Sequence, residues 1–84
     1  KSRDGQERRA LLAARDAAIG ARRNAENTIR GLLASFGLRV PGRPRTYEAR
    51  IRAVLEGQDA LAPIILPLLA IRTEALRQAA ALTK

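Results

Sequence analysis

The sequence predicts an all-α fold in which a long helix, an arginine-rich loop, a short helix and a returning helix form a hairpin or bundle with coiled-coil character. Three observations predict it. No proline interrupts residues 4–36, small and apolar residues recur there every seven positions, and a glycine follows each of the first two apolar segments. The chain has 84 residues, so we expect one small domain over 1–84.

The first helix is predicted over residues 4–36. Asp4 and Glu7 have the spacing of a capping box, with the aspartate in place of Ser or Thr. Gly37 stands where a left-handed C-terminal cap belongs.

Small residues dominate one face of this helix at heptad spacing, which is typical of a coiled coil. Thr28 and Ser35 extend the second position of the repeat. A seam of small side chains allows a partner helix to approach closely, but it buries little area per turn. The predicted packing and oligomer seam consists of Leu11, Ala14, Ala18, Ala21, Ala25 and Leu32.

A loop over residues 37–45 and a second helix over 46–56 follow. Pro41 and Pro44 prevent the loop from being helical throughout. Thr46 is the predicted N-cap of the second helix and Gly57 its stop. Its apolar face is predicted to contain Tyr47, Ile51, Val54 and Leu55.

The third helix is predicted over residues 59–83, with Asp59 as its cap and Pro63 in its first turn. Pro67 should kink this helix or delay its start. Its inner face should pack antiparallel on the seam of the first helix. That face is predicted to contain Leu68, Leu69, Arg72, Leu76, Ala79 and Ala80.

The chain offers little for catalysis. It has no cysteine and no histidine, which removes the commonest thiolate and imidazole ligands and the commonest general base. No two of its eight carboxylates share a clearly apolar face, and Ser35 has no candidate base. We therefore expect no catalytic residue, metal site, cofactor or small-molecule substrate within these residues.

Charge indicates a different role. Lys and Arg number 16 against 8 Asp and Glu, giving a net charge of +8, and all the cations except Lys1 and Lys84 are arginines. Arginine binds phosphate through a planar fork of donors, so nucleic-acid contact is favoured over the alternative of codon bias with ordinary solvated arginines. The predicted nucleic-acid-binding residues are Arg22, Arg23, Arg30, Arg39, Arg43, Arg45, Arg50 and Arg52.

Three polar or aromatic residues near this cluster have two interpretations. Asn24 and Asn27 could hydrogen-bond a nucleic acid or could fix the register of packed helices, the second being at least as well supported. Tyr47 is the one candidate for stacking on a base, although a core or half-core position fits it better.

No segment predicts a membrane span. The apolar stretch over residues 61–71 is about half as long as a bilayer requires, and prolines interrupt it. We expect a soluble, intracellular chain, with a surface-lying amphipathic helix as an alternative that lacks interfacial aromatics. Because the sequence starts at Lys1 and has no methionine, we expect it to be part of a longer protein.

Two stretches resemble a known family. One contains Arg23, Asn27 and the run Ile29–Arg30–Gly31–Leu32–Leu33, followed by Phe36–Gly37–Leu38; the other is Tyr47–Glu48–Ala49–Arg50–Ile51–Arg52. Both are similar to the middle, coiled-coil region of DEDD-type insertion-sequence transposases of the IS one-ten and IS one-eleven type, the bridge-RNA-guided recombinases. Lys1–Ser2–Arg3 and Leu11–Leu12–Ala13–Ala14–Arg15 extend the likeness over nearly the whole chain, whereas Thr28 is an insertion relative to the family pattern.

The resemblance implies a helical linker between a RuvC-like nuclease domain and a domain with a nucleophilic serine. Both sets of catalytic residues would lie outside this chain, and Ser35 matches no part of the serine motif. It further implies a bacterial, cytoplasmic, nucleoid-associated protein acting in DNA transposition. Its partners would be DNA or structured guide RNA and a second protomer, contacted through the first and third helices.

A pure dimerisation coiled coil without nucleic-acid contact is the alternative function. A helix-turn-helix regulator fits poorly, because its turn usually has about 3–4 residues and the predicted loop is much longer.

Overall fold

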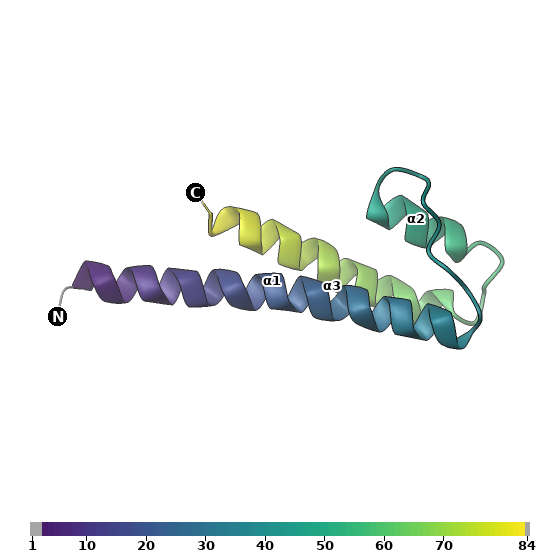
Figure 1. Cartoon of the computed structure of the whole chain (residues 1–84), viewed down its shortest axis with the longest axis horizontal. Coiled ribbons are helices and arrows are strands. Elements are labelled where there is room, and N and C mark those ends of the chain that lie inside the picture. Colours follow the sequence, from purple (N-terminus) through teal and green to yellow (C-terminus); the bar gives the residue numbers. More distant parts are fainter. Residues whose placement is uncertain (1–2, 84) are drawn as a thin grey trace.

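The computed structural model describes residues 3–83 and has three helices in that range: α1 (Arg3–Ser35), α2 (Tyr47–Val54) and α3 (Ala62–Ala81). α3 runs back antiparallel along α1, and α2 lies beside them at the end where the chain reverses (Figure 1). The predicted all-α class and the packing of the first helix on the third are confirmed. Each helix boundary lies within three residues of its prediction.

α1 is longer than the helix that packs on it. Arg15 Nε donates a hydrogen bond to Thr83 Oγ1 (3.1 Å), so the end of α3 is level with Arg15. Residues 3–14 extend past that point, over about 18 Å at 1.5 Å per residue (Figure 1). All of these residues except Gly5 are exposed. We call this segment the overhang.

The core lies at the opposite end, where all three helices meet. Ile29 of α1, Ile51 of α2 and Ile65 of α3 have no exposed surface. α2 is a short helix, of a length that is unstable alone, and it is held here by the apolar residues it shares with α1 and α3. The buried cluster consists of Ile29, Leu33, Ile51, Leu55, Leu61, Ile65 and Leu69.

Gly37 ends α1 as predicted. Its φ is 74°, in the left-handed region that favours glycine. The Gly37 amide donates to the Ala34 carbonyl (2.9 Å) and the Leu38 amide to the Leu33 carbonyl (2.8 Å). These two bonds form a Schellman motif, with Leu38 folded back toward Leu33. The motif satisfies two of the last carbonyls of α1 and starts the loop in a fixed direction.

The cap and stop of α2 are also as predicted. Thr46 Oγ1 accepts a hydrogen bond from the Ala49 amide (3.2 Å), which satisfies one of the unpaired donors of the first turn. Gly57 has a φ of 78°, and the helix ends at Val54, slightly before the predicted end.

The predicted cap of α3 is wrong. Asp59 is an exposed turn residue, and the N-cap is Leu61, whose side chain makes no capping bond. The Gln58 carbonyl instead accepts the amides of Leu61 and Ala62 (3.1 and 2.9 Å), so a backbone turn leads into the helix. Pro63 lies in the first turn as predicted.

α3 continues through Pro67, so this proline does not delay the start of the helix. Pro63 and Pro67 are both exposed. Pro67 has no N–H to donate to the Pro63 carbonyl. The carbonyl left without this helical hydrogen bond belongs to an exposed residue.

The face of α1 that packs on α3 differs in part from the predicted seam. Ala25 is buried and Ala18 and Leu32 are half-buried, as the seam requires. Leu11 is exposed because it lies in the overhang, and Ala14 and Ala21 are exposed because α3 covers the opposite flank of the repeat. That flank contains Arg15, Arg22 and Ile29.

The inner face of α3 shows a similar offset. Leu69 is buried and Leu68, Arg72 and Ala79 are half-buried, as predicted. Leu76 and Ala80 are exposed, and the position that is buried in this part of the helix is Ala75.

Candidate nucleic-acid interface

The chain reversal brings the loop arginines beside α2, but the eight predicted nucleic-acid-binding arginines do not form one uniform surface. Arg22, Arg50 and Arg52 are engaged by acceptors of the chain itself. The other five make no ion pair with a carboxylate among residues 3–83: Arg23, Arg30, Arg39, Arg43 and Arg45.

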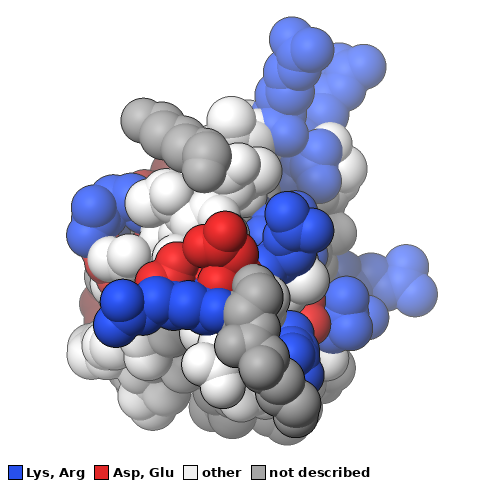
Figure 2. Space-filling view, turned by 90° about the vertical axis from the view of Figure 1, so that its left-hand side faces the viewer, with Lys and Arg blue, Asp and Glu red and all other residues white. Residues whose placement is uncertain are grey.

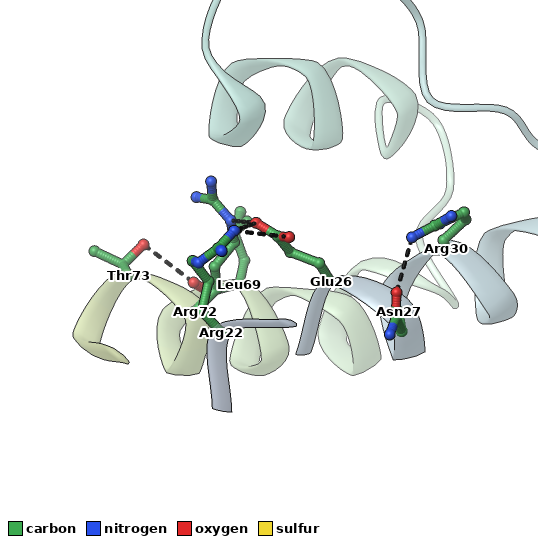
Figure 3. Close-up of polar contacts among 7 residues, drawn as sticks. All are labelled: Arg22, Glu26, Asn27, Arg30, Leu69, Arg72 and Thr73. Atoms are coloured by element: carbon green, nitrogen blue, oxygen red, sulfur yellow. Dashed lines mark hydrogen bonds and ion pairs between the residues drawn. The ribbon is translucent and has the colours of Figure 1, made fainter. Parts of the chain in front are cut away.

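Arg22 is part of a polar cluster between α1 and α3. Glu26 accepts from Arg22 Nη1 on its own helix (3.2 Å) and from Arg72 Nε on α3 (2.6 Å). The three side chains point toward one another beneath α2 (Figure 3). Because the Arg72 and Glu26 side chains are only 16% and 21% exposed, their attraction is screened less than that of a surface pair. Arg22 is therefore engaged by the carboxylate that joins α1 to α3.

Tyr47 extends this cluster to α2. The Arg72 guanidinium lies over its ring, 4.2 Å from the centroid, which is cation–π geometry. Burial raises the pKa of the Tyr47 hydroxyl, nearby Glu26 raises it further, and Arg72 and Arg30 lower it. The half-core prediction for Tyr47 is confirmed, and its ring face is occupied by Arg72.

Arg50 and Arg52 are engaged at the start of α2. Arg50 Nε donates to the Pro44 carbonyl (2.6 Å), which ties the loop to the helix that follows it. Arg52 Nε pairs with Glu48 one turn earlier (3.1 Å), and both side chains are well exposed. Arg52 is thus accessible but locally neutralised, whereas Arg50 is half-buried.

The five remaining arginines are exposed. Arg30 Nη2 donates to Asn27 Oδ1 (2.8 Å), and this neutral partner orients the guanidinium without cancelling its charge (Figure 3). Arg23 precedes Arg30 by seven residues, so both lie on the same side of α1. The other three stand on the loop. Figure 2 views the molecule from the end where the termini lie and shows basic side chains projecting from its outline, with acidic side chains gathered near the middle of that face.

A hollow lies where α1 passes into the loop. Its volume is about 360 Å³. Apolar side chains form most of its wall, and two of the five unpaired arginines border it. We call it the basic groove; it is lined by Arg30, Leu33, Ala34, Leu38, Arg39 and Val40.

A second hollow, of about 270 Å³, brings two carboxylates together. Glu48 of α2 and Glu74 of α3 both line it, beside Leu66 and Leu69, with Arg52 and Thr73 adding polar groups to its wall. Each is bound by an arginine of its own helix. The Arg77 hydrogen bond and then that of Gln78 lower the pKa of the Glu74 carboxyl. A carboxyl held ionised in this way is poorly suited to act as a general acid.

Residues 3–83 contain no group of three or more acidic, histidine or cysteine side chains placed to hold a metal ion. No helix in this range is long and apolar enough to cross a bilayer.

No known protein family, curated protein or solved structure matches the chain.

Sequence reasoning placed Arg72 on the inner face of α3 but did not predict its contacts with Glu26 and Tyr47. An arginine in the middle of an otherwise apolar helical face was a signal that a carboxylate or ring faces it. Its partners could not be named from the sequence, because Glu26 is 46 residues away along the chain.

Proposed function

We propose that this chain is a non-catalytic helical segment of a transposase or DNA recombinase, which joins protomers and contacts the backbone of DNA or guide RNA during DNA transposition. One observation carries the nucleic-acid part. Five exposed arginines that have no carboxylate partner among residues 3–83 lie on α1 and the loop, while the other three of the predicted cluster are engaged within the fold. The family resemblance of the sequence supplies the setting in transposition.

Such an arrangement suits phosphate contacts. A guanidinium offers two parallel donors to one phosphate, and neutralising phosphates releases condensed counterions, which drives binding at low salt. Contacts of this kind position a protein on nucleic acid but read little sequence. The expected role is therefore to hold DNA or RNA in place for catalytic domains elsewhere in the parent protein.

The overhang supports the second part of the proposal. Leu11 and Leu12 are 41% and 51% exposed there, and a helical segment this short gains most of its stability from packing. The exposed seam residues Ala14 and Ala21 continue the same side of α1 toward the core. A second protomer that packs along α1 would cover them. On α3, Ile64 and Ile71 are also exposed apolar residues.

Binding of labelled duplex DNA and structured RNA, measured by fluorescence anisotropy across a series of salt concentrations, tests the nucleic-acid part. We expect affinity to fall steeply with salt. The triple variant Arg39→Ala, Arg43→Ala, Arg45→Ala should bind more weakly, and its log–log salt slope should be shallower by about 0.9 for each duplex phosphate that the variant no longer neutralises.

A second triple variant, Arg3→Ala, Arg8→Ala, Arg9→Ala, is the matched control. It removes the same charge from the overhang and should keep most of the salt slope. Equal reductions of affinity in the two variants would show that only net charge matters. Undetectable binding of the unaltered chain at low salt would refute nucleic-acid contact by this segment.

A pure dimerisation coiled coil is the competing function, and the exposed leucines of the overhang favour it equally. Sedimentation equilibrium tests the feature that the two functions share. Both predict a dimer that weakens when Leu11 and Leu12 are replaced by glutamine. A monomer at high protein concentration would contradict both, and a dimer without nucleic-acid affinity would leave the coiled coil as the function.

A further inference from the structure

The basic groove has a pair of arginines at its border, which can bind phosphates, and an apolar floor, which a phosphate contact alone does not need. We propose that this groove holds one unstacked base of a single-stranded stretch of nucleic acid, while Arg30 and Arg39 bind the phosphates on either side. The proposal rests on the proposed function and specifies the form of nucleic acid that the turn end recognises.

The floor is built by the end of α1 and the loop that leaves it. The Schellman motif turns Leu38 back toward Leu33, and Val40 follows on the same side of the loop. Ala34 leaves room because its side chain is a single methyl group. The Ala34 and Leu33 carbonyls are already bonded to the loop amides, which reduces the unpaired negative ends that α1 would present to an anion.

The charges around the floor fit an anionic chain better than a single ion. Arg30 is oriented by Asn27 and keeps its charge. Arg23 lies about 10 Å before it along the helix axis, at 1.5 Å per residue, and Arg39 follows on the loop. A chain molecule with one anionic group in each repeating unit, and a flat apolar face between successive anionic groups, matches this succession of arginines around the apolar floor. A nucleotide chain has that chemistry, since every base offers a face that packs on apolar surface.

Duplex nucleic acid is a poor occupant. Its base faces are stacked inside the helix and only their edges are accessible in the grooves, so the apolar floor would gain nothing from it. An acidic peptide could meet the two arginines but would place no flat ring on the floor unless it carried aromatics.

The test compares a labelled oligothymidylate of about 12 nucleotides with its duplex of the same length, at equal salt. Ala34→Gln fills the floor with a neutral side chain at an exposed helical position, where glutamine is almost as good a helix former as alanine. We expect it to weaken single-strand binding by about fivefold or more and to change duplex binding less than about twofold.

Ala17→Gln is the matched control, because Ala17 is also an exposed alanine of α1 but lies away from the groove. It should leave both affinities unchanged, and circular dichroism should show equal helix content in all three proteins. Arg39→Ala should weaken single-strand and duplex binding alike.

Three outcomes would overturn the proposal. Equal weakening of single-strand and duplex binding in Ala34→Gln would refute a base in the groove while leaving phosphate contact intact. Competition by a polyglutamate peptide that is itself sensitive to Ala34→Gln would assign the groove to acidic protein segments. Absence of binding to either nucleic acid would refute the groove and the proposed function together.

Discussion

The two ends of α1 differ sharply in their surroundings. Over residues 25–33 the helix buries Ala25, Ile29 and Leu33, the last two in the cluster shared with α2 and α3, whereas the overhang leaves Leu11 and Leu12 exposed. One continuous helix thus has an end that is stabilised within its own chain and an end that is not. The difference teaches that helix length and fold stability are set by different parts of this sequence, and that the overhang is the place to look for a partner.

The largest expected effect comes from cutting a side chain at the core end. Ile29→Ala should lower the free energy of unfolding by about 2–5 kcal/mol, because it removes a fully buried side chain and leaves a cavity. Leu12→Ala, in the overhang, should change it by no more than about 0.5 kcal/mol at a protein concentration that keeps the chain monomeric. Urea denaturation followed by circular dichroism measures both. Similar decreases would mean that the overhang is as well packed as the core.

The polar cluster should come next. Arg72→Met removes the shared partner of Glu26 and Tyr47 and should cost about 1–3 kcal/mol, as expected for a hydrogen bond to a charged group that is largely buried. Arg77→Met is the matched control on the same helix. Its ion pair with Glu74 is exposed, so no measurable change in the urea midpoint is expected. If Arg72→Met also leaves the urea midpoint unchanged, the cluster does not hold the three helices together.

Gly31 inside α1 and Gly37 just after its end should respond to alanine with opposite signs. Gly37→Ala should destabilise the fold by about 1 kcal/mol, because Gly37 has a positive φ that alanine adopts poorly. Gly31→Ala should stabilise it by about 0.5–1 kcal/mol, since Gly31 is inside the helix and an added methyl group meets no other atom within 4 Å. Thermal denaturation of the two variants checks the signs. A stabilising Gly37→Ala would show that α1 does not end in the left-handed cap.

The smallest effect concerns the only tyrosine. Because the pKa of Tyr47 in the folded state is raised above 10.0, the folded state keeps the phenol proton at pH values at which the unfolded state has lost it. Stability linked to Tyr47 is therefore fully present below pH 10 and is lost as pH rises through the folded pKa. Phenolate absorbance gives the midpoint directly, with the urea-unfolded chain as reference. A native midpoint at or below the unfolded one would place Tyr47 outside the cluster.

Local chemistry made much of the fold predictable. Gly37, Thr46 and Gly57 mark helix ends through backbone preferences that operate within a few residues. The seam was harder, because alanines occupy both flanks of the repeat in α1 and only the position of α3 decides which flank is covered. Asp59 was a plausible cap by composition, yet a backbone turn at Gln58 leads into the helix instead.

The candidate site was predictable in outline only. The surplus of arginine over acidic residues indicated where phosphate contact would concentrate. Which arginines are engaged depended on contacts distant in sequence, such as Arg72 with Glu26, and on the loop path that brings the Pro44 carbonyl to Arg50. The basic groove depended on how the loop folds back over the end of α1, and the spacing of residues along the chain does not predict that path.

Amide hydrogen exchange along α1 tests the division between its two ends most directly. In dilute protein, residues 25–33 should be strongly protected and the overhang weakly protected. Raising the protein concentration should increase protection in the overhang, and adding single-stranded oligonucleotide should increase it around Arg30 and Arg39. Equal protection along α1 in dilute protein, or an oligonucleotide footprint on the overhang instead of the turn end, would contradict this assignment of the two ends.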